Sequence, residues 1–417
     1  MEPVKVIVAG AGARGMGYSQ YALAFPEKMK VVGVAEPREY YRMKMAQMHQ
    51  IPAENIYIDW QEMAEREKFA DAVIIATQDA MHEDPALAFS AKKYAILLEK
   101  PMAPTAQACQ RIIEAIKKNN NLFAVCHVMR YTAYTRQMKK LLEEGVIGDV
   151  ISLDLVEPVG FWHMAHSFVR GNWRNSTESS FMLLAKSCHD LDWIHYIIGE
   201  KCQSISSFGS LRHFRPEEAP KGAALRCVDC PSDVESQCPY SAKRIYIRGC
   251  IENGYTGWPV DVITTDLTRE GVIKALETGP YGRCVYHCDN DVVDHQVVNM
   301  EFEKGKTATF SMMAFTQMEN RRVTLFGTRG EIRGDGAKIH VYDFLTDTTR
   351  TIDTETADSS LLGGHGGGDY GLIHDFIEAV AKNDPSLVLT GPDETLESHM
   401  MVFAAEQART DRKIMEL

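Results

Sequence analysis

The sequence predicts an α/β protein with two parts. Residues 1–128 should form a doubly wound parallel sheet, and residues 129–417 an α+β domain with a large, mostly antiparallel open sheet. In the first part, short apolar runs alternate with helical stretches, which is typical of a parallel sheet. Later runs alternate apolar and polar residues, as strands with one covered face do. The length of 417 residues also exceeds what one hydrophobic core usually supports.

The first part contains short strands rich in β-branched and aliphatic residues, separated mainly by helices. We expect strands at 4–9, 31–35, 72–76, 94–98 and 122–127, and helices that include 85–91 and 106–119. In such a sheet ligands bind beyond the carboxyl ends of the strands, so this edge should border a cleft with the second part.

A glycine-rich turn follows the first strand and matches the pattern of a dinucleotide site. Gly10 permits a tight turn, Gly12 lets the backbone approach a pyrophosphate, and Gly15 lets the next helix pack close to the sheet. The second strand ends at Glu36, where a carboxylate can accept hydrogen bonds from an adenosine ribose. The pattern predicts a Rossmann-type NAD site. Glu36 would repel a 2′-phosphate, although the nearby Arg38 leaves weak NADP acceptance open.

The second part begins with a helix that Gly145 ends, followed by a strand at 150–156. No proline- or serine-rich linker separates the two parts, so we expect them to be closely apposed. Further strands are expected at 296–302, 307–314 and 322–326, and two closing helices, which could pack back on the first part, at about 370–382 and 394–412.

Composition and charge exclude several classes of function. The net charge of −12, without a clustered basic stripe, argues against a nucleic-acid partner. No apolar run is long enough to span a membrane, and the N-terminus lacks the apolar core of a signal peptide. We therefore expect a cytoplasmic protein whose ten cysteines are reduced.

Several ordered motifs, taken together, resemble the glucose-fructose oxidoreductase / inositol dehydrogenase / MocA (Gfo/Idh/MocA) family over nearly the whole chain. These motifs are the glycine turn with Glu36, the runs 77–82 and 98–101, Arg130-Tyr131 before a helix ending in 145–148, and the run 189–192.

The resemblance implies an NAD-dependent oxidoreductase with Lys100 at its reacting centre. In the run Glu99-Lys100-Pro101, the proline holds a turn from which Lys100 can project into the crevice. The family implies that Lys100 bridges the nicotinamide ribose and the substrate hydroxyl, where its charge would stabilise alkoxide character. The predicted cofactor-binding residues are Gly10, Gly12, Ala13, Arg14, Gly15, Glu36, Arg38, Thr77, His82, Glu99 and Lys100.

His189 is the second predicted catalytic residue, because an imidazole can take the hydroxyl proton near neutral pH. It lies in a stretch, 183–193, that indicates a helix. Many relatives have an aspartate four residues earlier, where this chain has Ala185. Either Asp190 or Asp192 supports the ring from another side, or Lys186 contributes a second cation.

The substrate-binding predictions draw on both parts of the chain. Arg130 could contact substrate or pair with a carboxylate, and the polar run around Asn290 could bind hydroxyl groups or form a rim. The glycine-rich run 363–370 would be either a mobile loop over the cleft or a plain connector. The predicted substrate-binding residues are Arg130, Lys186, His189, Asn290 and His365.

A cysteine-rich insertion occupies about residues 210–260. Its Cys227, Cys230 and Cys238 have a spacing that suits structural zinc, with no obvious fourth ligand. An unmetallated loop and a redox-active pair are the alternatives.

The leading hypothesis is hydride transfer between NAD(H) and a secondary alcohol of a sugar, cyclitol or sugar derivative. The alternative is NAD-dependent glycoside cleavage through transient sugar oxidation and elimination, and a third option is a non-enzymatic sugar or cofactor sensor. A homodimer or homotetramer is expected.

Overall fold

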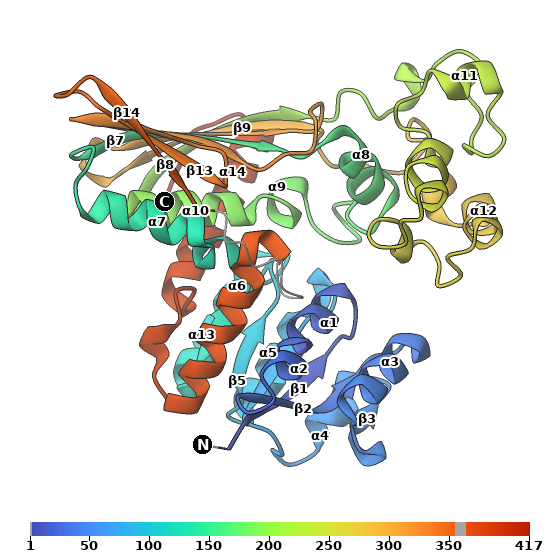
Figure 1. Cartoon of the computed structure of the whole chain (residues 1–417), viewed down its shortest axis with the longest axis horizontal. Helices are drawn as coiled ribbons and strands as arrows, with labels where there is room; N and C mark the ends of the chain where they lie inside the picture. Colours follow the sequence, from blue (N-terminus) through green and yellow to red (C-terminus); the bar gives the residue numbers. More distant parts are fainter. Residues whose placement is uncertain (1, 355–363) are drawn as a thin grey trace.

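The computed structural model describes residues 2–354 and 364–417 of the chain. Figure 1 shows the first sheet and its helices in the lower half of the molecule, with a broad second sheet above them. A lobe of short helices projects from one end of the second sheet (Figure 1).

The first sheet is parallel throughout and confirms the predicted doubly wound architecture. Within the described residues its strands are β1 Val4–Ala9, β2 Met29–Ala35, β3 Ile56–Tyr57, β4 Ala72–Ile75, β5 Ala95–Leu98 and β6 Phe123–Val125. Their order is β3-β2-β1-β4-β5-β6. Because the order reverses at β1, a crevice is expected beyond the carboxyl ends of β1 and β4.

Side chains of β1 alternate between two apolar clusters, so both faces of the sheet are covered. Val6 and Val8 belong to one buried cluster, and Ile7 and Ala9 belong to the other. The flanking helices are α1 Ala13–Ser19, α2 Tyr21–Ala24, α3 Glu39–His49, α4 Trp60–Glu65, α5 Glu83–Ala91 and α6 Ala106–Asn119.

The helix α6 shows how local sequence sets these boundaries. The Thr105 hydroxyl accepts a hydrogen bond from the Ala108 amide at 3.2 Å and so caps the first turn. Ile112 and Ile116 recur at one-turn spacing and are buried. The helix ends where Asn120 adopts a left-handed conformation.

The second sheet is large and antiparallel except for one parallel pair, which confirms the prediction for this part. Within the described residues its strands are β7 Val150–Pro158, β8 Cys202–Ser210, β9 His295–Phe302, β10 Thr307–Met313, β11 Arg322–Gly327, β12 Gly330–Gly334, β13 Lys338–Asp343, β14 Thr348–Asp353 and β15 Met415–Glu416. Their order is β14-β13-β12-β11-β7-β10-β9-β8-β15, and β7 and β10 form the parallel pair.

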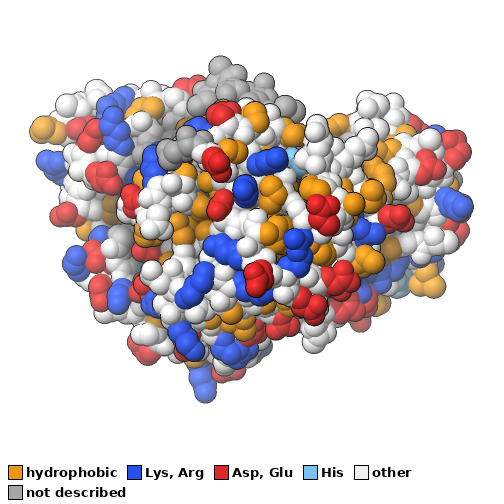
Figure 2. Space-filling model, turned by 90° about the horizontal axis from the view of Figure 1, so that it is seen from below, with side chains coloured by type: hydrophobic (Ala, Val, Ile, Leu, Met, Phe, Trp, Pro, Cys, Tyr) orange, Lys and Arg blue, Asp and Glu red, His pale blue; other side chains and the backbone are white. Residues whose placement is uncertain are grey.

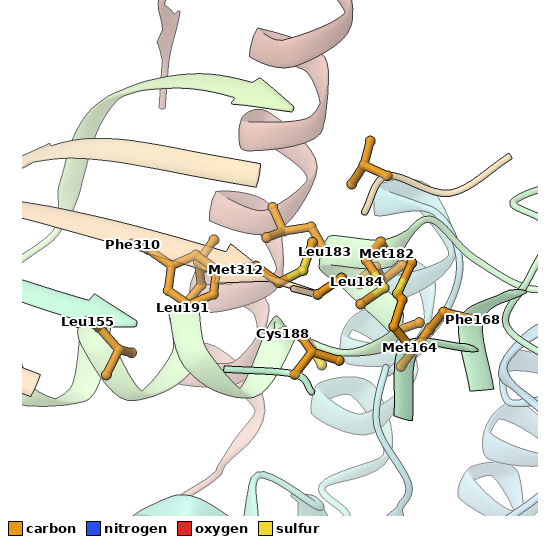
Figure 3. Packing of buried hydrophobic residues seen from close by; sticks show 14 of the residues in the cluster. Leu155, Met164, Phe168, Met182, Leu183, Leu184, Cys188, Leu191, Phe310 and Met312 are labelled. Atoms are coloured by element: carbon orange, nitrogen blue, oxygen red, sulfur yellow. The ribbon is translucent and has the colours of Figure 1, made fainter. Parts of the chain in front are cut away.

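Helices cover the face of the second sheet that is directed toward the first (Figure 1). They include α7 Ala133–Glu143, α9 Met182–Ala185 and α10 Cys188–Ile198. Phe310 and Met312 of β10 are buried in the same apolar cluster as Leu191 of α10 (Figure 3). Thr309 and Ser311 alternate with them and point to the opposite face.

The two closing helices, α13 Gly368–Lys382 and α14 Pro392–Asp411, pack back on the first part. Leu372 and Phe376 of α13 are fully buried in the cluster that contains Val6 of β1. Val402 of α14 packs in the core of the second sheet, while Leu396 packs against the first. The C-terminal helices therefore join the two parts.

The structure adds elements that the sequence pattern did not indicate. The strands β8 and β12–β14 were not expected, because their many serine, glycine, threonine and charged residues give weak strand patterns. Their pairing is instead imposed by neighbouring strands. The single helix expected over 183–193 is wrong, since α9 ends at Ala185 and α10 begins at Cys188. Lys186 lies in this break and pairs with Glu157 of β7.

The projecting lobe contains α8 Phe161–His163, α11 Ser232–Ser236 and α12 Arg269–Thr278.

Acidic and basic side chains are interspersed on the face of the molecule seen in Figure 2. Among the described residues, no helix combines the length and the apolar character needed to cross a membrane.

Candidate active site

The glycine turn packs so closely against its neighbours that side chains are excluded at two positions. Gly10 has φ +95°, and a Cβ there would collide with the carbonyl oxygen of Ala76. A Cβ at Gly15 would collide with the carbonyl oxygen of Gly10. At Gly12, by contrast, the nearest atom to a Cβ would be Nη2 of Arg38 at 3.4 Å. A side chain at Gly12 would therefore meet Arg38 at ordinary contact distance, and the pyrophosphate-binding role of Gly12 and Ala13 stays a prediction.

Glu36 lies beside this turn at the end of β2, 2% exposed. Its carboxylate accepts hydrogen bonds from the Ala11 amide at 2.9 Å and from Nε of Arg38 at 2.7 Å. Burial by itself raises the pKa of Glu36, but the hydrogen bonds from Arg38 hold it below its usual value. Glu36 is therefore a carboxylate placed where the second strand meets the glycine turn.

Arg14 and Glu99 form an ion-pair network behind the turn. Nε of Arg14 lies 2.7 Å from Glu99, and its Nη2 lies 2.6 Å from Asp369 at the start of α13. Tyr18 donates a further hydrogen bond to Glu99 at 2.8 Å. Burial raises the pKa of Glu99, while Arg14 and Lys100 lower it to below its usual value. This network ties the glycine turn to the end of β5 and to the C-terminal helix.

His82 connects two loops at the same sheet edge. Its Nδ1 lies 2.8 Å from the carbonyl oxygen of Pro101, and its Nε2 lies 3.1 Å from that of Thr77. The ring is 1% exposed. In this structure His82 holds the loops after β4 and β5 together.

A cavity of about 160 Å³ lies next to this edge and brings together three residues predicted from the sequence, Lys100, Lys186 and His189. Lys100 reaches across from β5 and donates a hydrogen bond to the Ala185 carbonyl oxygen at 2.9 Å. Ala185, which stands where many relatives have an aspartate, therefore contributes its backbone carbonyl oxygen as an acceptor for Lys100. The two lysine ammonium groups and the His189 imidazole thus share one small cavity.

A network of ion pairs lies beside this cavity and links Lys186 and Arg321 to two buried carboxylates. Nζ of Lys186 lies 2.9 Å from Glu157, and Nε of Arg321 lies 3.0 Å from Glu157 and 2.6 Å from Asp190. Burial raises the pKa of Glu157, but Arg321 and Lys186 hold it below its usual value. Asp190 thus faces Arg321, and Glu157 positions Lys186.

His189 belongs to a cluster of buried histidines whose rings are tilted or edge-on to one another. The rings of His127 and His189 have centroids 5.6 Å apart, and those of His127 and His399 are 5.3 Å apart. Desolvation lowers the pKa of His127 to about 3, so this ring is neutral at physiological pH. Asp192 lies 3.8 Å from the Nε2 of His127 and pairs with Arg130.

Two predicted substrate-binding residues lie away from this cavity. Arg130 is 2% exposed and makes two hydrogen bonds to Asp192, at 2.8 and 2.7 Å, so its guanidinium forms the internal ion pair that was the alternative interpretation. Asn290 donates to the Phe214 carbonyl at 3.1 Å in the projecting lobe. The run 355–363 lies outside the described residues, as does the side chain of His365.

The cysteines of the insertion also gather around a cavity, but a very small one. Cys227, Cys230, Cys238 and Cys284 line a space of about 20 Å³. Across residues 2–354 and 364–417, no group of three or more His, Cys, Asp or Glu side chains is arranged to hold a metal ion. The structure therefore does not support the predicted zinc site at Cys227, Cys230 and Cys238.

Several residues around the active-site cavity were missed from the sequence. His163, Phe168, Trp173 and Arg321 line it, and Glu157 supports it. Two histidines and four aromatic residues within the short run 161–173 were the available signal. Arg321 had none, because it lies in a loop far along the chain.

Two models of known protein families match the chain. Residues 4–127 match a model described as "Oxidoreductase family, NAD-binding Rossmann fold", and residues 139–417 match its partner, "Oxidoreductase family, C-terminal alpha/beta domain". The chain belongs to the Gfo/Idh/MocA oxidoreductase family. The predicted resemblance, the enzyme class and the NAD-binding Rossmann domain are thereby confirmed.

Individual Gfo/Idh/MocA relatives are distant. The chain is 26% identical over 327 residues to the putative oxidoreductase YteT of Bacillus subtilis, covering 73% of this chain and 71% of that protein. It is 28% identical over 203 residues to inositol 2-dehydrogenase of Klebsiella pneumoniae, covering 48% of this chain and 56% of the relative. Thus the alignment spans little more than half of the inositol dehydrogenase.

Among solved Gfo/Idh/MocA structures, levoglucosan dehydrogenase in complex with NADH and levoglucosan is similar to the whole chain. The TM-score is 0.71 with 17% sequence identity, and the match covers 100% of this chain and 99% of that one. At this identity the likeness supports the fold.

Proposed function

We propose that the protein is an NAD(H)-dependent dehydrogenase of a secondary alcohol in a sugar, cyclitol or sugar derivative. The observation that supports this best is the shared cavity of Lys100, Lys186 and His189 beside the cofactor-binding edge of the first sheet. The name of the inositol dehydrogenase relative supports a polyhydroxylated substrate.

The residues around the glycine turn support NAD as the cofactor. The backbone near Gly12 would approach the pyrophosphate, and Glu36 would accept hydrogen bonds from the adenosine ribose. The Arg38 side chain, which now pairs with Glu36, would move aside for the ribose hydroxyls. When bound, NAD supplies the acceptor for the hydride that leaves the alcohol carbon.

His189 and Lys100 have different roles at the substrate oxygen. His189 takes the hydroxyl proton as the carbon loses its hydride and becomes a carbonyl. Lys100 places a positive charge beside the oxygen, where negative charge develops. Lys186, held by Glu157, presents a second cation to the same cavity and positions neighbouring hydroxyl groups.

The direct test is NAD reduction across a panel of sugars, cyclitols and glycosides, with Lys100→Met as the key variant. We expect this variant to lose about 10²–10³-fold in kcat because a donor at the developing charge is removed. NAD binding, measured by calorimetry, should persist. Lys118→Met, which changes an exposed lysine on α6, is the matched control. Full activity of Lys100→Met would refute the assignment.

The same panel separates net oxidation from glycoside cleavage. Net NADH formation with a free sugar supports the dehydrogenase. Release of an aglycone without net NADH would instead favour transient oxidation followed by elimination.

We also propose that the chain forms a homodimer or homotetramer through the open face of the second sheet. No helix of the described residues covers this face in Figure 1, and Phe208 and Phe326 are exposed on it by 63% and 37%. A second copy of this sheet would bury both rings.

A further inference from the structure

A second cavity, about 500 Å³ in volume, lies in the projecting lobe. We call it the outer cavity. It is lined largely by aromatic and aliphatic side chains, among them Phe161, Trp162, Arg244, Tyr255, Trp258 and Met318. Its volume falls in the range of small-molecule binding sites, whereas the active-site cavity of about 160 Å³ lies below that range.

A continuous series of ring contacts joins the two cavities. Trp173 and Phe168 line the active-site cavity with ring centroids 5.9 Å apart, and Phe168 lies 5.7 Å from His163. His163 in turn contacts Trp258 at 5.0 Å, and Trp258 contacts Trp162 at 5.1 Å in the outer cavity. An aromatic wall therefore extends from the reacting centre into the lobe.

Two short segments of chain each contribute to both cavities. Phe161 and Trp162 of α8 line the outer cavity, and the next residue, His163, lines the active-site cavity. Similarly, Met318 lines the outer cavity and Arg321 the inner one. Because consecutive Cα atoms are about 3.8 Å apart, the two spaces must be close neighbours.

The outer cavity exposes apolar surface that the fold does not use. Trp258, Tyr255 and Met318 are exposed by 38%, 51% and 44%. Single exposed apolar residues are ordinary, but several that line one concave space are typical of a ligand site. Arg244 is also exposed at this cavity. Within the part of the chain that the structure describes, its guanidinium forms no ion pair.

We propose that the outer cavity binds the ring attached to the oxidised sugar through a glycosidic bond, so that the natural substrate is a glycoside. This inference rests on the proposed function and specifies its substrate class. The axial C–H groups of a pyranose ring form an apolar face that packs on indole rings, as an aryl ring also does. The Arg244 guanidinium would donate hydrogen bonds to the outward hydroxyl groups.

The test compares a free sugar with its glycosides in the wild type and in Trp162→Ala. Glucose, maltose, cellobiose and the two anomeric p-nitrophenyl glucosides distinguish a second sugar ring from an aryl ring. We expect kcat/KM for the preferred glycoside to fall at least tenfold in Trp162→Ala, while that for glucose changes less than twofold. Trp162→Phe should restore most of the loss, and Leu345→Ala, at a residue 93% exposed elsewhere, should change neither value.

Binding provides a readout that does not depend on turnover. Saturation-transfer NMR with NAD present should show the distal ring of the glycoside in contact with the wild type, and the signal should weaken in Trp162→Ala. If no sugar reduces NAD but this contact persists and depends on Trp162, the result supports ring binding in the outer cavity and contradicts the proposed hydride transfer. Equal losses for glucose and glycosides, or no glycoside binding to the wild type, would overturn the inference. Circular dichroism of Trp162→Ala and of a second variant, Tyr255→Ala, verifies that both are folded.

Discussion

At the end of β2, Glu36 and Arg38 show how one side-chain pair can set cofactor choice. The Glu36 carboxylate is buried and pairs with Arg38, whose side chain is 57% exposed and lies over the Tyr41 ring. A bound 2′-phosphate would face the negative charge of Glu36, but without that charge Arg38 would be available to pair with it. We therefore propose that the negative charge of Glu36 sets the preference for NAD over NADP.

We predict that Glu36→Ala raises the ratio of kcat/KM for NADP over that for NAD by about tenfold or more, equivalent to about 1.4 kcal/mol. Steady-state kinetics with both cofactors measure it. Glu39→Ala, at an exposed acid three residues on, is the control and should leave the ratio unchanged. An unaltered ratio in Glu36→Ala would show that the ribose assignment is wrong.

The buried histidines predict acid sensitivity. Burial lowers the pKa values of His127 and His166 to about 3, and both rings are at most 2% exposed. The unfolded chain binds protons below about pH 6.5 while these folded rings stay neutral, so stability falls as the pH drops from 6.5 toward 3. Each such ring should cost about 2 kcal/mol between pH 7 and pH 5.

We predict that His127→Leu reduces the loss of unfolding free energy between pH 7 and pH 5 by about 2 kcal/mol, because the variant has no ring to protonate in the unfolded chain. The substitution removes no hydrogen bond, since both ring nitrogens of His127 lack hydrogen-bond partners among the described residues. Urea unfolding at pH 7 and pH 5 gives the comparison. The wild type and the variant losing equal stability on acidification would contradict the assignment of His127 as a buried neutral ring.

At the scale of elements, α13 is a C-terminal helix that completes the N-terminal sheet. Its Phe376 is fully buried beside β1, and its first turn contributes Asp369 to Arg14 of the glycine turn. These contacts join the glycine turn and β1 to residues more than 350 positions away along the chain.

We predict that Phe376→Ala destabilises the protein by about 3–5 kcal/mol, because it leaves a large cavity between α13 and the sheet. Thermal unfolding should show a lower Tm, together with weaker NAD binding. Phe344→Ala, at a residue 52% exposed, should change stability by less than about 0.5 kcal/mol. Equal effects of the two substitutions would mean that α13 does not support the site.

At the scale of the whole molecule, the second sheet has one face covered by helices and one open. We predict that Phe208→Glu dissociates the proposed oligomer, because it places a charge in the face that would be buried between copies. Light scattering coupled to gel filtration measures the mass. A wild-type protein that is already monomeric would exclude this assembly.

Much of the first part was predictable because its signals are local. The strand, the glycine spacing, Glu36 and the run ending in Lys100 lie within short stretches, and the topology of a parallel sheet brings strand ends to one edge. The proximity of Lys100 and His189 followed only from the family resemblance. The structure places both at one cavity, and the catalytic role of Lys100 is the prediction that Lys100→Met tests.

The sequence alone determined the class of fold, the cofactor-binding turn and the family, because these depend on spacing along the chain. Only the tertiary structure decided that Arg130 pairs with Asp192, that Glu157 holds Lys186, and that ring contacts lead from the cavity of Lys100 and His189 into the lobe. These contacts join residues that are 29 to 95 positions apart. Their formation depends on how helices and sheets pack, for which no local pattern exists.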